Sequence, residues 1–492
     1  MKSGVAGGSI GSASMSRVSL VVLALILTAA AVLRFYKLDS LPPGLFPDEA
    51  MNGNDAIEAI RTTGLRIFYP ANYGREGLFI NLQALAIQMT GRQDAWVLRA
   101  VSALAGTLTV AAFAFLLLEL GRASRIRSPE RLALVAAGLL ATSFWHVVFS
   151  RLGLRAILAP LFLSLALAFL VRGLVRRSLL AAVIGGAAFG LGFHTYISYR
   201  IAPLLLLPFW RRVRSTSGGV RLAAAFLISG ICLAAPLAVH FILRPADFSQ
   251  RARDVSVFAS SHPGQAILHN IVSAAGMFHV RGDGNWIYNV PGRPQLFLLT
   301  GLFMVLGLVV AARRRSLLDG VFVFWLALGM LPTILTNPAP HALRSLLAAP
   351  AALALAASGL NTLFERVPER VPRWLASAAL ALLPLAQGID TWATYFHQWG
   401  ESPRVYYEMG GDLSIIARQI DALPASAEKV VVVRSPGPSM NGVPWTGLGV
   451  AYLTDSYTPE SRASRHVRYM SGKEWASLED QMRGCYVFVL DP

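Results

Sequence analysis

An acidic pair and an arginine-glutamate pair are the residues of this sequence whose types and spacing best suit chemistry. Asp48 and Glu49 come shortly after the first apolar segment, and Arg75 and Glu76 lie further along the same polar stretch. A carboxylate can accept the proton of an attacking hydroxyl, while an arginine can bind two phosphate oxygens and keep its charge when partly desolvated. Together these groups suit the transfer of a group from a phosphate carrier to a hydroxyl acceptor.

Further polar residues are expected beside them, because the topology predicted below places all of them on one side of a membrane. Histidines and tyrosines there can exchange hydrogen bonds with a substrate, and arginines add positive charge for a phosphate. These candidates are Arg75, Glu76, Arg99, His194, Tyr196, Tyr199, Arg200, His341 and Arg344, and the same ends of later segments also supply His146, Arg151 and Arg155.

Each candidate also has a simpler explanation. Asp48 and Glu49 can stabilise the N-terminus of the helix that follows them. Single arginines near a membrane surface often contact lipid phosphates, and buried histidines often only form hydrogen bonds. Tyr196 and Tyr199 can belong to an aromatic belt at the membrane surface. The combination of these residues, more than any one of them, indicates a site.

The segments that must position these residues are apolar runs of bilayer-spanning length. Hydrophobic residues make up 54% of the chain, and they cluster in runs too long for the strands or helices of a small soluble core. We therefore predict a polytopic α-helical membrane protein, whose membrane domain, residues 17–390, contains about eleven transmembrane helices. The predicted spans are 18–33, 96–120, 132–149, 157–171, 179–193, 196–210, 222–243, 296–312, 317–335, 345–364 and 374–385.

Basic clusters between the apolar runs orient these spans. Lys and Arg number 44 against 27 Asp and Glu, which gives a net charge of +17. The positive-inside rule places such clusters in the cytoplasm, so the basicity indicates topology and argues against a nucleic-acid partner. It predicts a multi-pass protein of the plasma (inner) membrane with residues 1–16 as a disordered cytoplasmic tail. Large extracytoplasmic loops are expected at 37–95, with surface helices at 49–60 and 78–89, and at 244–294.

The chain changes character after the last span, and residues 391–492 predict a small extracytoplasmic α/β module. Helices are expected at 403–422 and 473–482. Short strands rich in β-branched and aromatic residues are expected at 429–434, 450–454, 466–470 and 486–490. We expect this module to cap the membrane domain and not to carry a separate activity.

Three motifs carry a family resemblance. They are Pro47-Asp48-Glu49 soon after the first span, Arg75-Glu76 ahead of a surface helix, and Val97-Leu98-Arg99-Ala100 at the start of the next span. In these features the sequence resembles bacterial relatives of protein O-mannosyltransferases and of lipid A aminoarabinose transferases, which are GT-C glycosyltransferases (glycosyltransferase family 39-like). The resemblance implies that Asp48 is the base or essential acid, that Glu49 supports it and that Glu76 belongs to the site.

The resemblance is incomplete after Glu76. Lys-Pro follows the corresponding glutamate in the aminoarabinose transferases, whereas Gly77-Leu78 follows here, so the phosphate role of that lysine does not carry over and Arg75 is the nearest substitute. The segments 192–203 and 340–344 resemble patterns in bacterial members of this group that lack a defined acceptor. The sequence holds no Trp-Trp-Asp motif of the kind found in oligosaccharyltransferases, which favours a single sugar over a whole glycan.

The sequence therefore predicts a membrane glycosyltransferase that moves one sugar from a polyprenyl-phosphate donor to an extracytoplasmic lipid, glycan or protein hydroxyl by inverting displacement. The donor, membrane lipids and the acceptor are the expected partners. No metal or other cofactor is expected to be obligatory, although Glu76 and an outer histidine could together bind a divalent metal. The alternative is a transporter or flippase of a lipid-linked intermediate, since intramembrane arginines and many spans also describe such proteins. A sensor or assembly subunit, in which Asp48 is dispensable, is a third interpretation.

Overall fold

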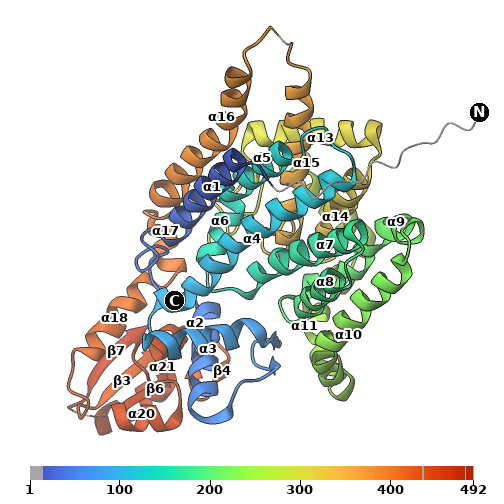
Figure 1. Cartoon of the computed structure of the whole chain (residues 1–492). Helices are drawn as coiled ribbons and strands as arrows, with labels where there is room; N and C mark the ends of the chain where they lie inside the picture. The colour runs from blue at the N-terminus through green and yellow to red at the C-terminus, as the bar shows by residue number, and fades with distance from the viewer. Residues whose placement is uncertain (1–14, 369, 435–436, 483, 491–492) are drawn as a thin grey trace, which may run out of the picture.

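A bundle of membrane helices forms most of the molecule, and a smaller mixed α/β region lies at one end of it (Figure 1). The computed structural model describes residues 15–368, 370–434, 437–482 and 484–490, so nearly all of the predicted N-terminal tail falls outside the described residues. The helices of the bundle are α1 (Arg17–Phe35), α4 (Ala95–Ala123), α5 (Pro129–Thr142), α6 (Phe144–Arg151), α7 (Leu158–Arg176), α8 (Leu179–Gly192), α10 (Gly219–Leu243), α13 (Leu298–Arg314), α14 (Leu317–Ile334), α15 (Ala349–Glu365) and α16 (Arg373–Trp392).

The helices of this bundle have the length and composition of membrane spans. In the described part of the chain, six helices are long and apolar enough to cross a membrane, or seven if α5 and α6, which meet at an angle of 57°, form one bent span. Nine of the eleven predicted spans coincide with one α-helix each, the span at 132–149 is divided between α5 and α6, and the span at 196–210 is the exception. The chain is thus a polytopic helical membrane protein.

The exception is the run predicted as a span at 196–210. It forms a 3₁₀ helix, η3 (Ile197–Phe209), with Pro203 and Pro208 inside it, and the short helix α9 (Trp210–Ser215) follows. A proline donates no backbone hydrogen bond and its ring crowds the carbonyl four residues earlier, so two prolines in one short run disfavour α-helical geometry. The apolar composition predicted the position of this segment but not its conformation.

Glycines allow two of the helices to approach closely. A Cβ atom on Gly186 of α8 would lie 2.0 Å from the carbonyl oxygen of Phe226 in α10, and one on Gly190 would lie 2.3 Å from that of Gly230. Small residues at helix contacts let membrane helices pack backbone against backbone. This contact holds α10, and the loop that follows it, against the rest of the bundle.

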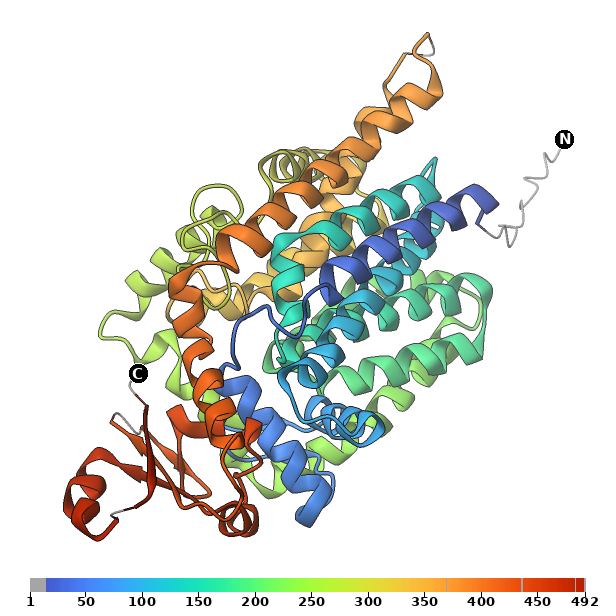
Figure 2. The same cartoon turned by 90° about the vertical axis from the view of Figure 1, so that its left-hand side faces the viewer.

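The first polar loop folds over one end of the bundle. It contains α2 (Pro47–Glu58), α3 (Leu78–Thr90) and the short antiparallel strands β1 (Phe68–Tyr69) and β2 (Arg75–Glu76). Figure 1 and Figure 2 both show α2 and α3 beside the α/β region, at the end opposite the turn that joins α15 to α16. The second large loop supplies α11 (Pro245–Asp254), η4 (Val257–Ala259) and α12 (Pro263–Gly276).

The α/β region contains a parallel sheet of three strands in the order β6-β3-β7. The strands predicted near 429, 466 and 486 are present, and α21 begins the helix predicted at 473–482. The elements here are α17 (Pro403–Glu408), α18 (Gly411–Asp421), β3 (Lys429–Val433), β4 (Ser439–Met440), β5 (Val443–Pro444), α19 (Leu448–Leu453), α20 (Pro459–Arg465), β6 (Val467–Ser471), α21 (Gly472–Leu478) and β7 (Tyr486–Leu490).

The strand predicted at 450–454 is wrong, because this segment forms the helix α19. All residues from Leu448 to Tyr452 are buried, and a short apolar run that is buried on every side does not reveal its period. One side of α19 packs on α2 through Leu448 and Tyr452, while Val450 faces the core that α18 forms with the sheet. The α/β region is thereby attached to the helix that carries Asp48.

Candidate active site

Asp48 lines a small polar pocket, whose empty space of about 340 Å³ includes open solvent. It lies half-buried in the first turn of α2, where the helix N-terminus favours a negative charge. Its Oδ1 atom accepts a hydrogen bond of 2.6 Å from the side-chain amide of Asn72. The residues around the pocket come from the first loop and from three later segments, and they are Asp48, Asn52, Asn72, Arg75, Leu154, Arg155, Ala156, Tyr196 and Leu343.

Arg75 closes the side of the pocket nearest α2. Its guanidinium group is buried, donates a 2.7 Å hydrogen bond to the side-chain oxygen of Asn52 and forms an ion pair with Asp55. Burial raises the pKa of the Asp55 carboxyl, while the charge of Arg75 opposes that shift. Arg75 is therefore held by two residues of α2, and one edge of its side chain contributes positive charge to the pocket wall.

Glu76 links the pocket to a second arginine. Its Oε2 atom lies 2.9 Å from Nε of Arg155, which lines the pocket beside the ring of Tyr196, and its Oε1 atom lies 3.7 Å from Nη2 of Arg200. One carboxylate thus lies between two guanidinium groups, and the three side chains together carry a net positive charge. In the described part of the chain, Glu76 is thus flanked by two arginines.

Glu49 and Arg99 do not line the pocket. Both side chains are fully buried and form a two-point ion pair, with both N···O distances 3.0 Å. Arg99 also donates to the carbonyl oxygens of Pro42 and Gly44, and Glu49 accepts a 2.6 Å hydrogen bond from the backbone of Gly153. With its donors used in this way, Arg99 fixes the loop before α2 and thereby the position of Asp48.

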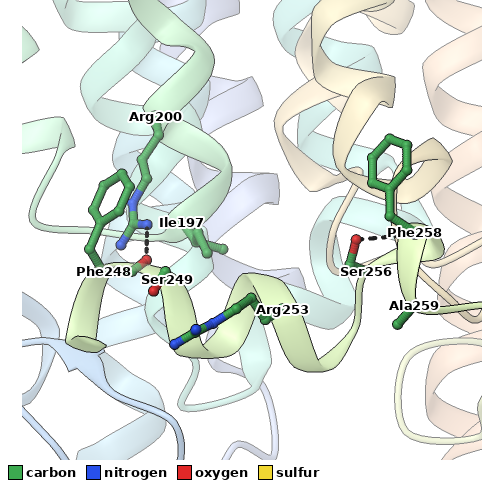
Figure 3. Close-up of a pocket in the computed structure, with 8 residues that line it drawn as sticks. All are labelled: Ile197, Arg200, Phe248, Ser249, Arg253, Ser256, Phe258 and Ala259. Atoms are coloured by element: carbon green, nitrogen blue, oxygen red, sulfur yellow. Dashed lines mark hydrogen bonds between the residues drawn. The ribbon is translucent and has the colours of Figure 1, made fainter. Parts of the chain in front are cut away.

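A second and more open cavity lies between η3 and α11 (Figure 3). Its empty space is about 1050 Å³, part of it open to solvent. Arg200 points from η3 towards Phe248, donates a 2.8 Å hydrogen bond to that residue's carbonyl oxygen and lies over its ring. Arg253 of α11 adds a second guanidinium group, and Phe258 adds an apolar wall. Contacts from Arg200 through Glu76 to Arg155 connect this cavity with the Asp48 pocket.

Three further candidates lie in the protein core. Nε2 of His194 lies 2.9 Å from the carbonyl oxygen of Leu233 in α10, and Tyr199 is fully buried among aromatic rings. Arg151 is also buried, and its guanidinium donates to carbonyl oxygens between Leu33 and Leu41. These side chains hold helices together and none of them lines either cavity.

His341 and Arg344 belong to a neighbouring cluster around Asp283. Nδ1 of His341 lies 3.7 Å from Oδ2 of Asp283, and its ring packs on Tyr288. Arg344 donates hydrogen bonds to the segment just before it, at Thr336 and Asn337. Burial raises the pKa of the Asp283 carboxyl, although backbone hydrogen bonds from Ala342 and Asn285 oppose the shift. Leu343, which lies between His341 and Arg344 in the chain, lines the Asp48 pocket.

Sequence reasoning missed two amides of the pocket. Asn52 lies one helical turn after Asp48, on the same face of α2, and that spacing is a signal that would have selected it. Asn72 lies just before Tyr73-Gly74, and the sequence of this segment predicts a turn without indicating a functional side chain. Within the described residues, no group of three or more His, Cys, Asp or Glu side chains is arranged to hold a metal ion.

Comparison with solved structures identifies proteins with a similar overall fold. ArnT from Cupriavidus metallidurans, solved bound to undecaprenyl phosphate, is similar with a TM-score of 0.59 at 14% identity, over 94% of this chain and 95% of that one. The archaeal oligosaccharyltransferase AglB from Archaeoglobus fulgidus, solved with an inhibitory peptide and a dolichol-phosphate, is similar with a TM-score of 0.55 at 14% identity, over 94% of this chain and 70% of that one.

Sequence comparison adds no assignment, since no protein-family model and no curated protein matches this chain. At 14% identity the structural likeness concerns the fold. The chain is a polytopic helical membrane protein with the GT-C fold, which it shares with ArnT over almost its whole length.

Proposed function

We propose that this protein is an inverting membrane glycosyltransferase that moves a single sugar from a polyprenyl-phosphate donor to a hydroxyl acceptor. The observation that carries the proposal is the half-buried carboxylate of Asp48, which lines a pocket with Arg75 and Arg155 in a chain of the GT-C fold. Asp48 supplies a base and the arginines supply positive charge for a departing phosphate. The membrane bundle gives a lipid-linked donor access to this pocket by lateral diffusion.

In the proposed reaction Asp48 accepts the proton of the acceptor hydroxyl while that oxygen attacks the anomeric carbon. The bond between this carbon and the phosphate oxygen breaks at the same time, and polyprenyl phosphate leaves with the bonding electron pair. Charge grows on the phosphate as it leaves, and a preorganised guanidinium group stabilises that charge. Arg155, which is paired with Glu76, and Arg75, which is paired with Asp55, both line the pocket and supply this positive charge.

We place the phosphate of the donor between Arg155 and Arg200, which flank the Glu76 carboxylate, and its first isoprene units in the cavity beyond Arg200. Arg200 lies against Phe248 there (Figure 3), and Arg253 and Phe258 also line the cavity. This mixture of positive and apolar groups matches an anionic head group followed by a hydrocarbon chain. The structures of ArnT and AglB that share the fold hold undecaprenyl phosphate and a dolichol-phosphate. We further propose that the site faces the extracytoplasmic side of the plasma membrane.

The decisive experiment compares turnover by wild type and Asp48→Asn. The purified protein is placed in lipid vesicles with radiolabelled polyprenyl-phosphate monosaccharides, and with an envelope lipid and glycan extract as a source of acceptors. Removal of a general base is expected to lower turnover by about 10²- to 10⁴-fold. Asp39→Asn is the matched control, because Asp39 is an exposed carboxylate on the same loop and its loss should change nothing.

Two results would contradict the proposal. If Asp48→Asn turns over a donor as fast as wild type does, the assignment of Asp48 as base is wrong. If wild type leaves every donor intact in the presence of the extract, and moves intact lipid-linked sugar between leaflets, the transporter interpretation replaces the transferase.

A further inference from the structure

The turn that precedes Arg75 is strained, and it lies at the pocket. Asn72, Tyr73 and Gly74 have φ angles of 53°, 59° and 82°, so three successive residues adopt the left-handed conformation. Such conformations are uncommon for residues other than glycine, and one that is bulky, as Tyr73 is, signals a constraint imposed by the surroundings. Strain of this kind persists only where the rest of the structure holds it in place.

Two arginines of the pocket wall hold this turn at both ends. Nε of Arg75 donates to the carbonyl oxygen of Ala71 at 3.3 Å, and Nη2 of Arg155 donates to that of Gly74 at 3.4 Å. The turn is also closed from the side, because a Cβ atom on Gly74 would lie 2.3 Å from the ring of Phe68. The backbone at 71–74 is therefore fixed by the same side chains that give the pocket its charge.

What the turn presents to the pocket is the amide of Asn72. Its Nδ2 atom lies 2.6 Å from Oδ1 of Asp48, and both residues line the pocket. A carboxylate can only accept a hydrogen bond, so the NH₂ end of the amide must face it. Among the described residues, Asn72 is the one partner that hydrogen-bonds to the Asp48 side chain, and the Oδ2 atom accepts no hydrogen bond.

We propose that Asn72 is a positioning residue for Asp48. The inference rests on the proposed function, in which Asp48 is the base. The amide holds Oδ1, which fixes the rotation of the carboxylate and leaves Oδ2 available for the proton of the acceptor hydroxyl. Asparagine suits this place for two reasons, since it tolerates the left-handed conformation and its amide donates to a carboxylate.

A simpler explanation is that asparagine occurs here only because it tolerates a positive φ. Asn72→Gly separates the two explanations, because glycine adopts this conformation readily but has no amide to donate. Asn441 provides a matched control. It also has a positive φ of 49°, and it donates a 3.1 Å hydrogen bond to Glu58 at the other end of α2, outside the pocket.

The test measures kcat and KM for the donor, together with thermal unfolding, in wild type, Asn72→Gly and Asn441→Gly. Loss of a hydrogen bond that orients a reacting carboxylate is expected to lower kcat of Asn72→Gly by about 10- to 100-fold. The KM for the donor should stay within about twofold and the unfolding temperature should stay unchanged, since the change affects neither donor contacts nor the backbone. Asn441→Gly should behave as wild type.

Each contrary result has a distinct meaning. If wild type turns over the donor and Asn72→Gly has the same kcat, Asn72 serves only the turn and the inference is wrong. If Asn72→Gly lowers the unfolding temperature and raises KM while kcat is kept, its role is structural, which also overturns the inference. A wild type without turnover on any donor overturns the proposed function and this inference together.

Discussion

Replacement of Glu49 by alanine should release α2 from the bundle, whereas replacement of the neighbouring Asp48 by asparagine should leave α2 in place. The Glu49 carboxylate is fully buried, and it accepts two hydrogen bonds from Arg99 at 3.0 Å, one from the backbone of Gly153 at 2.6 Å and one from that of Phe46 at 3.4 Å. These contacts join α2, α4 and the turn before α7. Without the carboxylate, Arg99 is left as a buried charge without its partner.

The size of the effect follows from this burial. Breaking a buried ion pair by removing one partner costs about 3–5 kcal/mol, mainly because the remaining charge stays desolvated. Each 1.4 kcal/mol corresponds to a factor of about ten in an equilibrium constant. The opening equilibrium of α2 should therefore shift by about 10²- to 10³-fold or more in Glu49→Ala, and its amide hydrogens should exchange faster by that factor.

Hydrogen exchange followed by mass spectrometry of peptides from α2 measures this shift, and peptides from α13 serve as an internal reference. Asp48→Asn should change the exchange of α2 far less, because that side chain is half-buried and, within the described residues, is hydrogen-bonded to Asn72 alone. The double variant Glu49→Leu, Arg99→Met removes both charges and should recover much of the protection. Equal protection of α2 in wild type and Glu49→Ala would show that the ion pair does not hold this helix.

Two further predictions concern the membrane bundle and the Asp283 cluster. Gly186→Val should separate α8 from α10 and lower the unfolding temperature in detergent, whereas Gly320→Val on α14, where a Cβ atom meets nothing within 4 Å, should not. The raised pKa of Asp283 means that its ionised form disfavours the folded state, so its contribution to stability is greatest below the unfolded pKa of about 3.9 and is lost as the pH rises towards the folded pKa. The unfolding temperature of wild type should therefore fall relative to that of Asp283→Asn as the pH rises above about 3.9, and parallel curves would contradict this.

The membrane architecture was the part of the fold that the sequence predicted best. Long apolar runs leave a chain little choice but to form helices, because a bilayer supplies no hydrogen-bond partners for the backbone. Prediction failed where this constraint is weak. The run before Trp210 contains two prolines and forms the 3₁₀ helix η3 instead of an α-helical span. The apolar segment at 450–454 forms α19 instead of a strand, because the sequence of a run that is buried on all sides shows no helical period.

The roles of the two acidic neighbours were harder to predict than their presence. Adjacent residues on a helix point about 100° apart, so only one of Asp48 and Glu49 can face a given pocket. Which one does so depends on Arg99 and on Gly153, whose contacts with Glu49 join residues 50 and 104 positions apart. Asn72 was missed because its importance comes from a backbone conformation that residue types alone do not reveal.

The attachment of the α/β region to α2 also has a consequence for the order in which the protein is made. Asn54 of α2 donates a hydrogen bond to the carbonyl oxygen of Leu448, 394 positions later, and Arg61 reaches Asp455 at 2.7 Å. At about 5–20 residues per second, translation leaves α2 without this partner for roughly 20–80 s. The helix that carries Asp48 thus gains this partner only after α16, the last helix of the bundle, has been synthesised, so a nascent chain contains every residue that lines the Asp48 pocket before it contains the segment that anchors α2 from outside the bundle.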